Sequence, residues 1–377
     1  MRKAHPGYKL RGREQMNLFR NALAILGGVA LATAMAGSAP AQAPLPQPSA
    51  AHPWIQGAPF PDPSEEVLGA TAAGKLYVFA GLAPGWKPKA MVVEYDPASN
   101  AWTKKKPMQL PSHHVALASL NDKIYAFGGF AYPGSGPPGW TPVNNVFEYD
   151  PAADAWKELA PMPTKRGAAS AGVANGKIYV TGGVNSLPGV TENGVHPTRA
   201  QNVVATVEEY DPATNSWKSL RPMLVARNHH LALGADGRVY VIGGRIGSGF
   251  ISSGSNNIDL VEMYDPATDM WTPRTRMPTA RSAIAGGLYN GTQLLVAGGE
   301  GQDARFLAAF KAVEAYDTKL NQWQSLPSMP HPRHGLAAGI IGNRLYTVSG
   351  DGQSAGNGIE HSAVAFNEIL QLDLVLK

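Results

Sequence analysis

The stretch IYVTGG (178–183), followed by EEYDPATNSW (208–217), decides the fold of this chain. It joins an apolar strand, a glycine doublet and a Tyr-Asp-Pro turn that leads to a tryptophan. Similar stretches recur about every 50 residues, which is the length of one supersecondary unit that buries its apolar faces against its neighbours. The glycine steps that mark the copies end at Gly81, Gly129, Gly183, Gly244, Gly299 and Gly350.

Within one copy the apolar residues alternate with a period of two, which is typical of strands rather than helices. The copy from Gly167 to Trp217 predicts strands over 168–174, 177–181 and 204–210, and a short fourth strand that holds Trp217. Its Asn175-Gly176 dipeptide is a strong hairpin signal. Four antiparallel strands, repeated around an axis, make a β-propeller.

The glycine steps number six, but the tryptophans that close a copy number only five: Trp102, Trp156, Trp217, Trp271 and Trp323. The last copy ends without a fourth strand. WIQGAPFP (54–61) is similar to WKELAPMP (156–163), so we expect Trp54 to supply the outer strand of the last blade. This pairing closes the ring and removes sheet edges that invite aggregation. The predicted fold is an all-β, six-bladed propeller over residues 54–377.

The pattern IYVxGG, V-E-x-Y-D-P, x-W and M-P-x-x-R resembles the kelch repeat, and it extends over essentially all of residues 54–377. Local departures are Ala80-Gly81, Ser349-Gly350 and Asp317-Thr318. The resemblance implies a kelch propeller of the exported bacterial type. It also implies that the arginine of M-P-x-x-R contributes to ligand binding, as it does in some members.

The first 41 residues have the pattern of a signal peptide. Arginines precede an apolar run over 22–36, and Ala39-Pro40-Ala41 is an acceptable cleavage site. The Pro-rich segment 42–53 is expected to be a linker, and the mature protein is expected to be periplasmic or secreted. The alternative is an uncleaved N-terminal anchor, and either Met1 or Met16 fits as the start.

Composition excludes several classes of protein. The chain has no cysteine, which excludes disulfides, thiolate metal sites and a cysteine nucleophile. Its net charge is +4 and only 16% of its residues are charged, without a basic cluster that would favour nucleic acid. No cofactor motif is present, so we expect no cofactor. We also expect no stable membrane insertion after cleavage of the signal peptide, and a monomer.

Strand alternation places the loops between second and third strands on one face, together with the links between blades. This face is the predicted ligand-binding surface, with guanidinium groups around the channel mouth that suit a carboxylate or phosphate. In the alternative interpretation each arginine pairs with backbone carbonyls or with Glu208, Glu262 or Glu314, and ties blades together. The candidate residues in the links are Arg166, Arg227, Arg281, Arg333, Ser112, His114 and His229.

Trp86 and Trp140 lie outside the repeat pattern, in long loops on the same face. They are candidates for stacking on a sugar or anchoring a peptide, and the alternative is that they pack across the loop bases. The loop acids Glu300, Asp303, Asp351 and Glu360 have no spacing that indicates catalysis, so no catalytic residue is assigned.

A metal site is not expected. His113-His114 and His229-His230 are adjacent pairs, and neighbours on a strand point to opposite faces. His114 and His229 lie two blades apart.

Two functions follow from this pattern. The first is an exported, non-catalytic module that binds a protein segment or an envelope glycan, including acidic ones, through the predicted ligand-binding surface. The alternative is a carbohydrate-active enzyme similar to the exported sialic acid mutarotases, which are kelch propellers of comparable length. The copper chemistry of the galactose oxidase type needs a cysteine, which this chain lacks.

Overall fold

The computed structural model describes residues 43–376, apart from 84, 133–139, 188, 190–194, 196–200, 248–255, 303–306 and 355–361. Residues 41–377 form one compact unit. The predicted signal peptide lies outside the described residues. Among those residues, no helix has the length and apolar character needed to cross a membrane.

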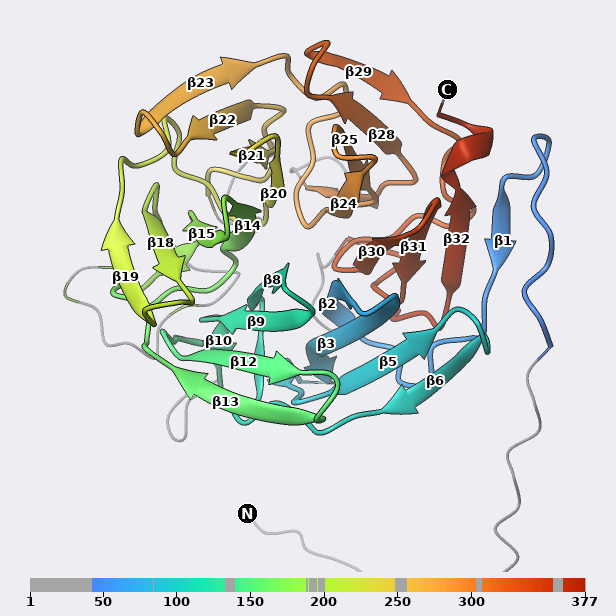
Figure 1. Ribbon diagram of the computed structural model, residues 1–377, viewed down its shortest axis with the longest axis horizontal. Helices are drawn as coiled ribbons and strands as arrows, with labels where there is room; N and C mark the ends of the chain where they lie inside the picture. The colour runs from blue at the N-terminus through green and yellow to red at the C-terminus, as the bar shows by residue number, and fades with distance from the viewer. Residues whose placement is uncertain are drawn as a thin grey trace, which may run out of the picture. The chain divides into compact units, whose positions relative to one another are not determined.

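Six four-stranded antiparallel sheets surround a central axis, as Figure 1 shows, so the predicted propeller is confirmed. We number these blades in chain order and describe each from its innermost strand outward. Blade 1 contains β2 (Glu65–Ala72), β3 (Lys75–Ala83), β5 (Val92–Asp96) and β6 (Ala101–Lys104), with β4 (Lys87–Pro88) beside β3. Blade 2 contains β8 (Ala116–Leu120), β9 (Lys123–Phe127), β12 (Val146–Asp150) and β13 (Ala155–Leu159). Blade 3 contains β14 (Ser170–Ala174), β15 (Lys177–Thr181), β18 (Val207–Asp211) and β19 (Ser216–Ser219).

The remaining blades repeat this order. Blade 4 contains β20 (Leu231–Ala235), β21 (Arg238–Ile242), β22 (Val261–Asp265) and β23 (Met270–Arg274). Blade 5 contains β24 (Ala285–Tyr289), β25 (Gln293–Ala297), β28 (Val313–Asp317) and β29 (Gln322–Ser325). Blade 6 contains β30 (Ala337–Ile341), β31 (Arg344–Val348), β32 (Asn367–Gln371) and β1 (Trp54–Gln56).

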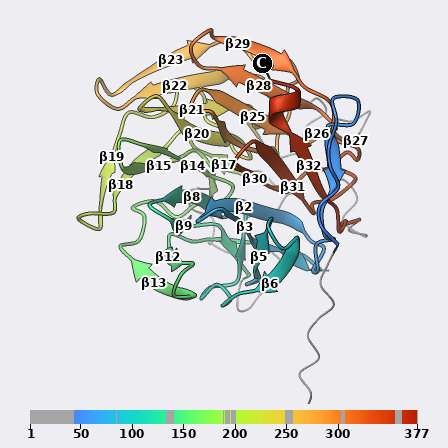
Figure 2. The same cartoon turned by 45° about the vertical axis from the view of Figure 1, so that its right-hand side comes forward.

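The outer strand of blade 6 comes from the other end of the chain, as the sequence predicted. β1 pairs with β32 in antiparallel register, with Trp54 opposite Leu370 (Figure 2). Ile55 packs with Ile369 in one apolar cluster of the core. The third strand of this blade ends at Gln371, and a short 3₁₀ turn (Leu372–Leu374) follows.

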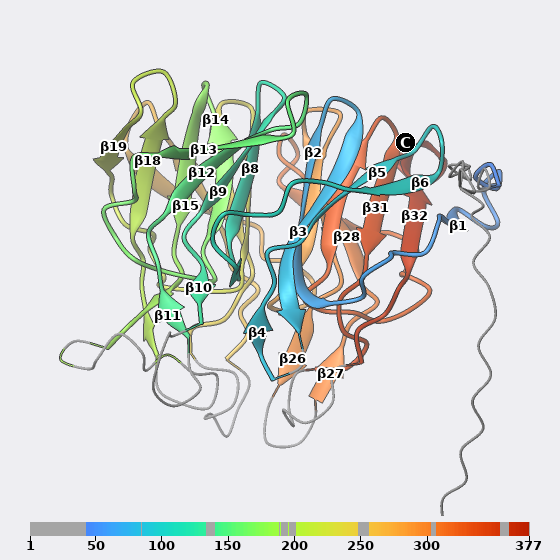
Figure 3. The same cartoon turned by 90° about the horizontal axis from the view of Figure 1, so that it is seen from below.

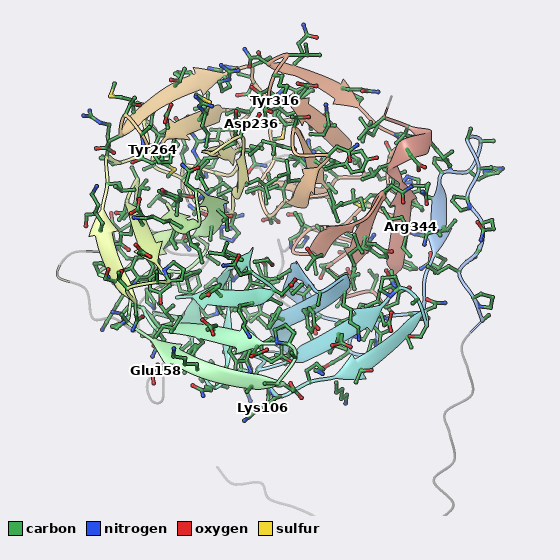
Figure 4. The ribbon with its side chains drawn as sticks, viewed as in Figure 1. Lys106, Glu158, Asp236, Tyr264, Tyr316 and Arg344 are labelled. Carbon is green, nitrogen blue, oxygen red and sulfur yellow. The ribbon has the colours of Figure 1, made fainter. Side chains whose placement is uncertain are left out.

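Tyrosine and tryptophan fill the space between blades. Tyr264 and Tyr316 are buried between sheets, whereas Lys106 and Glu158 lie at the outer rim (Figure 4). In each blade the tryptophan indole donates a hydrogen bond of 2.9–3.1 Å to a backbone carbonyl of the preceding link. Trp54 makes the sixth of these contacts, to Pro327.

The loops between second and third strands and the links between blades gather on one side of the ring, below the sheets in Figure 3. We call this side the loop face. Short additional strands occur here: β7 (Ser112–His113), β10 (Phe130–Ala131), β11 (Thr141–Pro142), β16 (Val184–Asn185), β17 (Asn202–Val203), β26 (Glu300–Gln302) and β27 (Leu307–Ala309).

Candidate functional site

One residue from each blade lies near the loop face with the same unusual backbone conformation. All six have φ between 51° and 53°, in the left-handed region that costs a non-glycine residue about 1 kcal/mol or more. Backbone hydrogen bonds of 2.9–3.2 Å connect five of these residues from blade to blade, and Val67, the neighbour of the sixth, donates to Gly335 at 3.0 Å. We call them the axial belt: Glu66, His114, Ala168, His229, Ala283 and Gly335.

Three members of the axial belt bring polar side chains to the axis. His114 Nε2 lies 3.1 Å from a carboxylate oxygen of Glu66. The His114 and His229 rings are 4.7 Å apart at their centroids, although their blades are not neighbours. The reason given above against a metal site, the distance between these two blades, is therefore wrong.

His229 is held in one tautomer. Its Nδ1 lies 2.5 Å from the amide oxygen of Asn228, so Nδ1 carries the proton and Nε2 is the acceptor. Nε2 accepts from Arg245 Nη2 at 3.0 Å. Burial lowers the pKa of His229 well below its ordinary value, and Arg245 and His114 add to that effect, so the ring is neutral.

A second set of side chains comes from the residue that directly follows the glycine step of each blade, just beyond the end of the second strand. In blades 1 to 3 these positions hold the apolar residues Leu82, Phe130 and Val184; in blades 4 to 6 they hold Arg245, Glu300 and Asp351. One half of the axis mouth is therefore apolar and the other half is charged.

The charged half is a buried network. Arg245 Nη1 pairs with Glu300 at 2.6 Å, and Ser354 donates to the other oxygen of Glu300 at 3.0 Å. His334, fully buried, lies 3.8 Å from Glu300 and 4.0 Å from Glu66. Burial by itself lowers the pKa of His334, but the carboxylates of Glu300, Glu66, Glu65 and Asp351 raise it above its ordinary value.

Glu66 responds in the opposite direction. Burial by itself raises its pKa, but His114, followed by His334 and Arg245, lowers it to about 2. The carboxyl group is therefore ionised at neutral pH. Glu300 and Asp351, two of the four loop acids named from the sequence, are buried. Asp303 and Glu360 lie outside the described residues.

The apolar half is covered by the two loop tryptophans. Trp140 is buried, with its ring 4.4 Å from His113 and 5.6 Å from Phe130 at their centroids, and its backbone pairs with Val195 of the next blade. The prediction that Trp140 is available to stack on a ligand is therefore wrong, because it packs across the loop bases. Trp86 is half-buried against Trp140.

The four link arginines do not line the channel mouth. Each is fully buried, and each guanidinium pairs with a glutamate of the third strand of its own blade at 2.5–2.9 Å. Several of the remaining donors reach backbone carbonyls; Arg281, for example, donates to Gly298 at 2.7 Å, whereas Nε of Arg166 and of Arg333 has no partner among the described residues. The prediction of a guanidinium ring is wrong, and the alternative interpretation describes the structure. The four pairs are Arg166–Glu208, Arg227–Glu262, Arg281–Glu314 and Arg333–Glu368.

Blades 1 and 2 explain why the set of arginines is uneven. Ser64 and Ser112 replace arginine there, and the positions that hold glutamate in the other blades hold Val93 and Phe147. Ser112 is buried and donates to its own loop, at Leu110. Cation and anion are thus present or absent together, which is expected of a buried pair that supports the fold.

The comparisons with known proteins agree with this architecture. Residues 49–244 match the KLHDC2/KLHL20/DRC7 Kelch-repeats domain, and residues 226–278 and 285–330 match the Kelch motif. The chain belongs to the kelch-repeat family.

Several known kelch proteins are similar to this chain. Kelch-like protein 23 of Homo sapiens is 28% identical over 215 residues, which are 56% of this chain and 34% of that protein. Kelch-like protein terF of Aspergillus terreus is 29% identical over 216 residues, 56% of this chain and 44% of that protein. The chain thus spans about a third of the length of the first curated relatives it matches.

Among solved structures, "Structure of YjhT" superposes with a TM-score of 0.65 at 19% identity. The match covers 84% of this chain and 97% of that one, and it shows a shared fold.

Two cavities lie along the channel of the propeller. One, of about 400 Å³, is lined by the inner strands without a titratable side chain. A cavity of about 60 Å³ lies beside Glu66, His114 and His229. This volume has room for an ion or a few waters, but it is well below the ~300 Å³ of a typical small-molecule site.

Sequence reasoning found His114 and His229 but missed Glu66, Arg245 and His334. His334 directly follows the link arginine Arg333, and Glu66 stands two residues after Ser64, which replaces that arginine in blade 1. Arg245 follows the glycine doublet of blade 4 directly. Alignment of the six copies at these positions would have revealed the polar set, because strict repeats put equivalent positions at one height around the axis.

Proposed function

We propose that this kelch propeller is an exported binding module that takes a protein segment on its loop face. The observation that carries the proposal is the distribution of exposed apolar side chains. Of the seven large apolar residues that are exposed in the described part of the chain, four stand on loops or links of the loop face: Tyr132, Leu187, Leu224 and Ile246.

These four residues belong to consecutive blades 2, 3 and 4. Ile246 and Leu224 expose about half of their surface, at 50% and 56%. Clustered apolar side chains on one face mark interaction sites, whereas singly scattered ones carry no such meaning. Extended loops on a rigid ring are also where a fold of this kind varies its contacts without disturbing its core. A periplasmic or secreted location is part of the proposal and rests on the signal-like N-terminus.

The test compares two pairs of substitutions. Leu224→Ser with Ile246→Ser removes apolar surface from the loop face. Met270→Ser with Leu320→Ser removes similar exposed surface, 48% and 67% of those side chains, from the turns of the opposite face. A protein captured from an envelope extract of the native host, then purified, is expected to bind the wild type and the Met270/Leu320 variant and to bind the Leu224/Ile246 variant at least about tenfold more weakly.

Equal binding by both variants, or no specific capture by the wild type, would contradict the proposal. A glycan screen with the same three proteins distinguishes the other ligand class: a glycan that requires Leu224 and Ile246 would replace the protein segment as ligand.

A second candidate is a sugar mutarotase. It is favoured by the contact of 3.1 Å between the Glu66 carboxylate and His114, with Arg245 nearby. Mutarotation needs a base that accepts the proton of the anomeric hydroxyl and an acid that donates a proton to the ring oxygen. A carboxylate beside an imidazole can supply these two groups. It ranks second because the adjoining cavity of about 60 Å³ is too small for a sugar ring.

Anomer exchange of N-acetylneuraminate, followed by NMR, tests this alternative directly. A mutarotase would accelerate exchange, and Glu66→Gln would abolish the acceleration. Anomer exchange at the uncatalysed rate in the presence of the wild type would exclude a mutarotase activity.

A further inference from the structure

We infer that the axial belt is a binding site for a divalent transition-metal ion, held by Glu66, His114 and His229. One ligand atom of each residue can be chosen so that all three lie within 4.8 Å of one another. Two imidazoles and one carboxylate with further positions open are the ligand set of many zinc and iron sites. This site is independent of the proposed partner surface.

The geometry needs only side-chain adjustment. Ligands 2.0–2.1 Å from a tetrahedral ion lie about 3.3 Å apart. Glu66 and His114 already meet this spacing at 3.1 Å. His229 has to turn toward them by up to about 1.5 Å, and the cavity of about 60 Å³ beside the three side chains provides the space.

The neighbours of His229 prepare it as a ligand. Metal-bound histidine usually donates its other ring N–H to an oxygen, which fixes the tautomer. Asn228 already accepts from Nδ1 at 2.5 Å, which leaves Nε2 as the electron-pair donor. Arg245 now donates to this nitrogen at 3.0 Å, and it would keep its 2.6 Å pair with Glu300 when a metal ion replaced it there.

The local charge favours a cation. Glu66 and Glu300 lie 4.0 and 3.8 Å from His334, and the backbone of the buried Asp351 pairs with that of His334. The Arg245 guanidinium pairs with one of these carboxylates, that of Glu300. Buried charges of one sign are costly without a counter-charge.

A nearby imidazole supplies a further donor. His334 is fully buried, and neither of its ring nitrogens has a hydrogen-bond partner among the described residues. It lies 4.0 Å from Glu66, which places a third imidazole nitrogen, and a fourth donor atom, at the edge of the site.

The belt itself supplies matched variants. Ala168 and Ala283 occupy the same backbone position as the two histidines, with φ of 53° and 51°. His114→Ala and His229→Ala therefore copy residues that this fold already accepts there. Glu66→Gln keeps size and removes charge, and His52→Ala removes an exposed histidine outside the belt.

The test measures Zn²⁺ directly in the full chain without an affinity tag. After chelator treatment and reloading, elemental analysis of the wild type and His52→Ala is expected to give one Zn²⁺ per chain. Calorimetry then gives the Zn²⁺ affinity of each ligand variant. We expect this affinity to fall by more than the ~10–100-fold that loss of an outer-shell partner causes in His114→Ala, His229→Ala and Glu66→Gln. Urea unfolding verifies that each variant is folded; if the alanine variants are not, Glu66→Gln decides alone.

Two results would overturn the site. No retained Zn²⁺ in the wild type would mean that Glu66, His114 and His229 hold no metal ion. Unchanged Zn²⁺ affinity in Glu66→Gln would mean that the ion binds elsewhere. Neither result depends on the partner experiment, since metal content is measured without a partner.

Discussion

The pairing of Arg281 with Glu314 allows a sharp test of what the buried arginines do. Arg281 Nη1 pairs with Glu314 at 2.5 Å, and the same guanidinium donates to three backbone carbonyls at 2.7–3.2 Å. Arg281→Ser leaves the Glu314 carboxylate buried with Thr279 as its remaining side-chain partner at 2.8 Å. Removing one member of a buried pair costs about 3–5 kcal/mol of unfolding free energy, so we expect about 4 kcal/mol here.

The double substitution Arg281→Ser with Glu314→Val should be milder than the single one. It copies blade 1, in which Ser64 and Val93 occupy these two positions. Both charges leave together, and the remaining cost is a partly filled cavity and the carbonyls that lose their donor, about 2 kcal/mol. The second substitution is therefore expected to restore about 2 kcal/mol, a coupling within the range of contacting residues.

Urea unfolding, followed by tryptophan fluorescence and by circular dichroism, measures these differences. Coincidence of the two transitions has to be established first, because a chain of this length can unfold through intermediates. The reasoning is refuted if Arg281→Ser costs less than about 1 kcal/mol, or if the double variant is no more stable than the single one.

Three further predictions concern other parts of the ring. The stabilisation that Glu66 provides is complete above its ordinary pKa of 4.5 and is lost as the pH falls toward its folded value of about 2, so acid unfolding curves of Glu66→Gln should lack that loss; a wild type and variant with the same pH dependence would contradict it. A β-carbon at Gly234 would lie 1.6 Å from the carbonyl oxygen of Val173 in the neighbouring blade, so Gly234→Ala should cost several kcal/mol in urea unfolding, whereas Gly176→Ala, whose β-carbon meets nothing within 4 Å, should cost only about 1 kcal/mol from its positive φ. Ile55→Asp places a charge in the core against Ile369, so hydrogen exchange of the β32 amides should rise more than that of the β22 amides; equal protection of both strands would refute the closure argument.

The sequence predicted the scaffold because the residues that build it repeat. Six glycine steps, five tryptophans and the stray Trp54 were enough to give six blades and their closure, and the structure adds that all six indoles make equivalent contacts. The same repetition led to the wrong prediction for the link arginines. A residue at one position in several blades was interpreted as a ring around the axis, whereas the guanidinium groups point into their own blades, toward Glu208 and its equivalents.

The axial site could be predicted only in part, because it is made where the copies differ. His114 meets His229 through the left-handed conformation of the belt, which turns side chains toward the axis and which no local propensity indicates for histidine or glutamate. The contact of Arg245 with His229 joins a glycine-step position to a belt position. Residues of this kind become neighbours because they lie at the same level along the propeller axis, which their spacing in the sequence does not indicate.

The closure of blade 6 also has a consequence for how the protein is made. Trp54 leaves the ribosome early, but its partner Leu370 is synthesised about 300 residues later, roughly 15–60 s at 5–20 residues per second. Throughout that interval β1 has no strand to pair with, so the ring cannot close even if the intervening blades have folded. The nascent chain therefore carries an open edge until β32 has been synthesised, which makes the arrival of that strand the moment of commitment and any earlier pairing with another chain the main hazard.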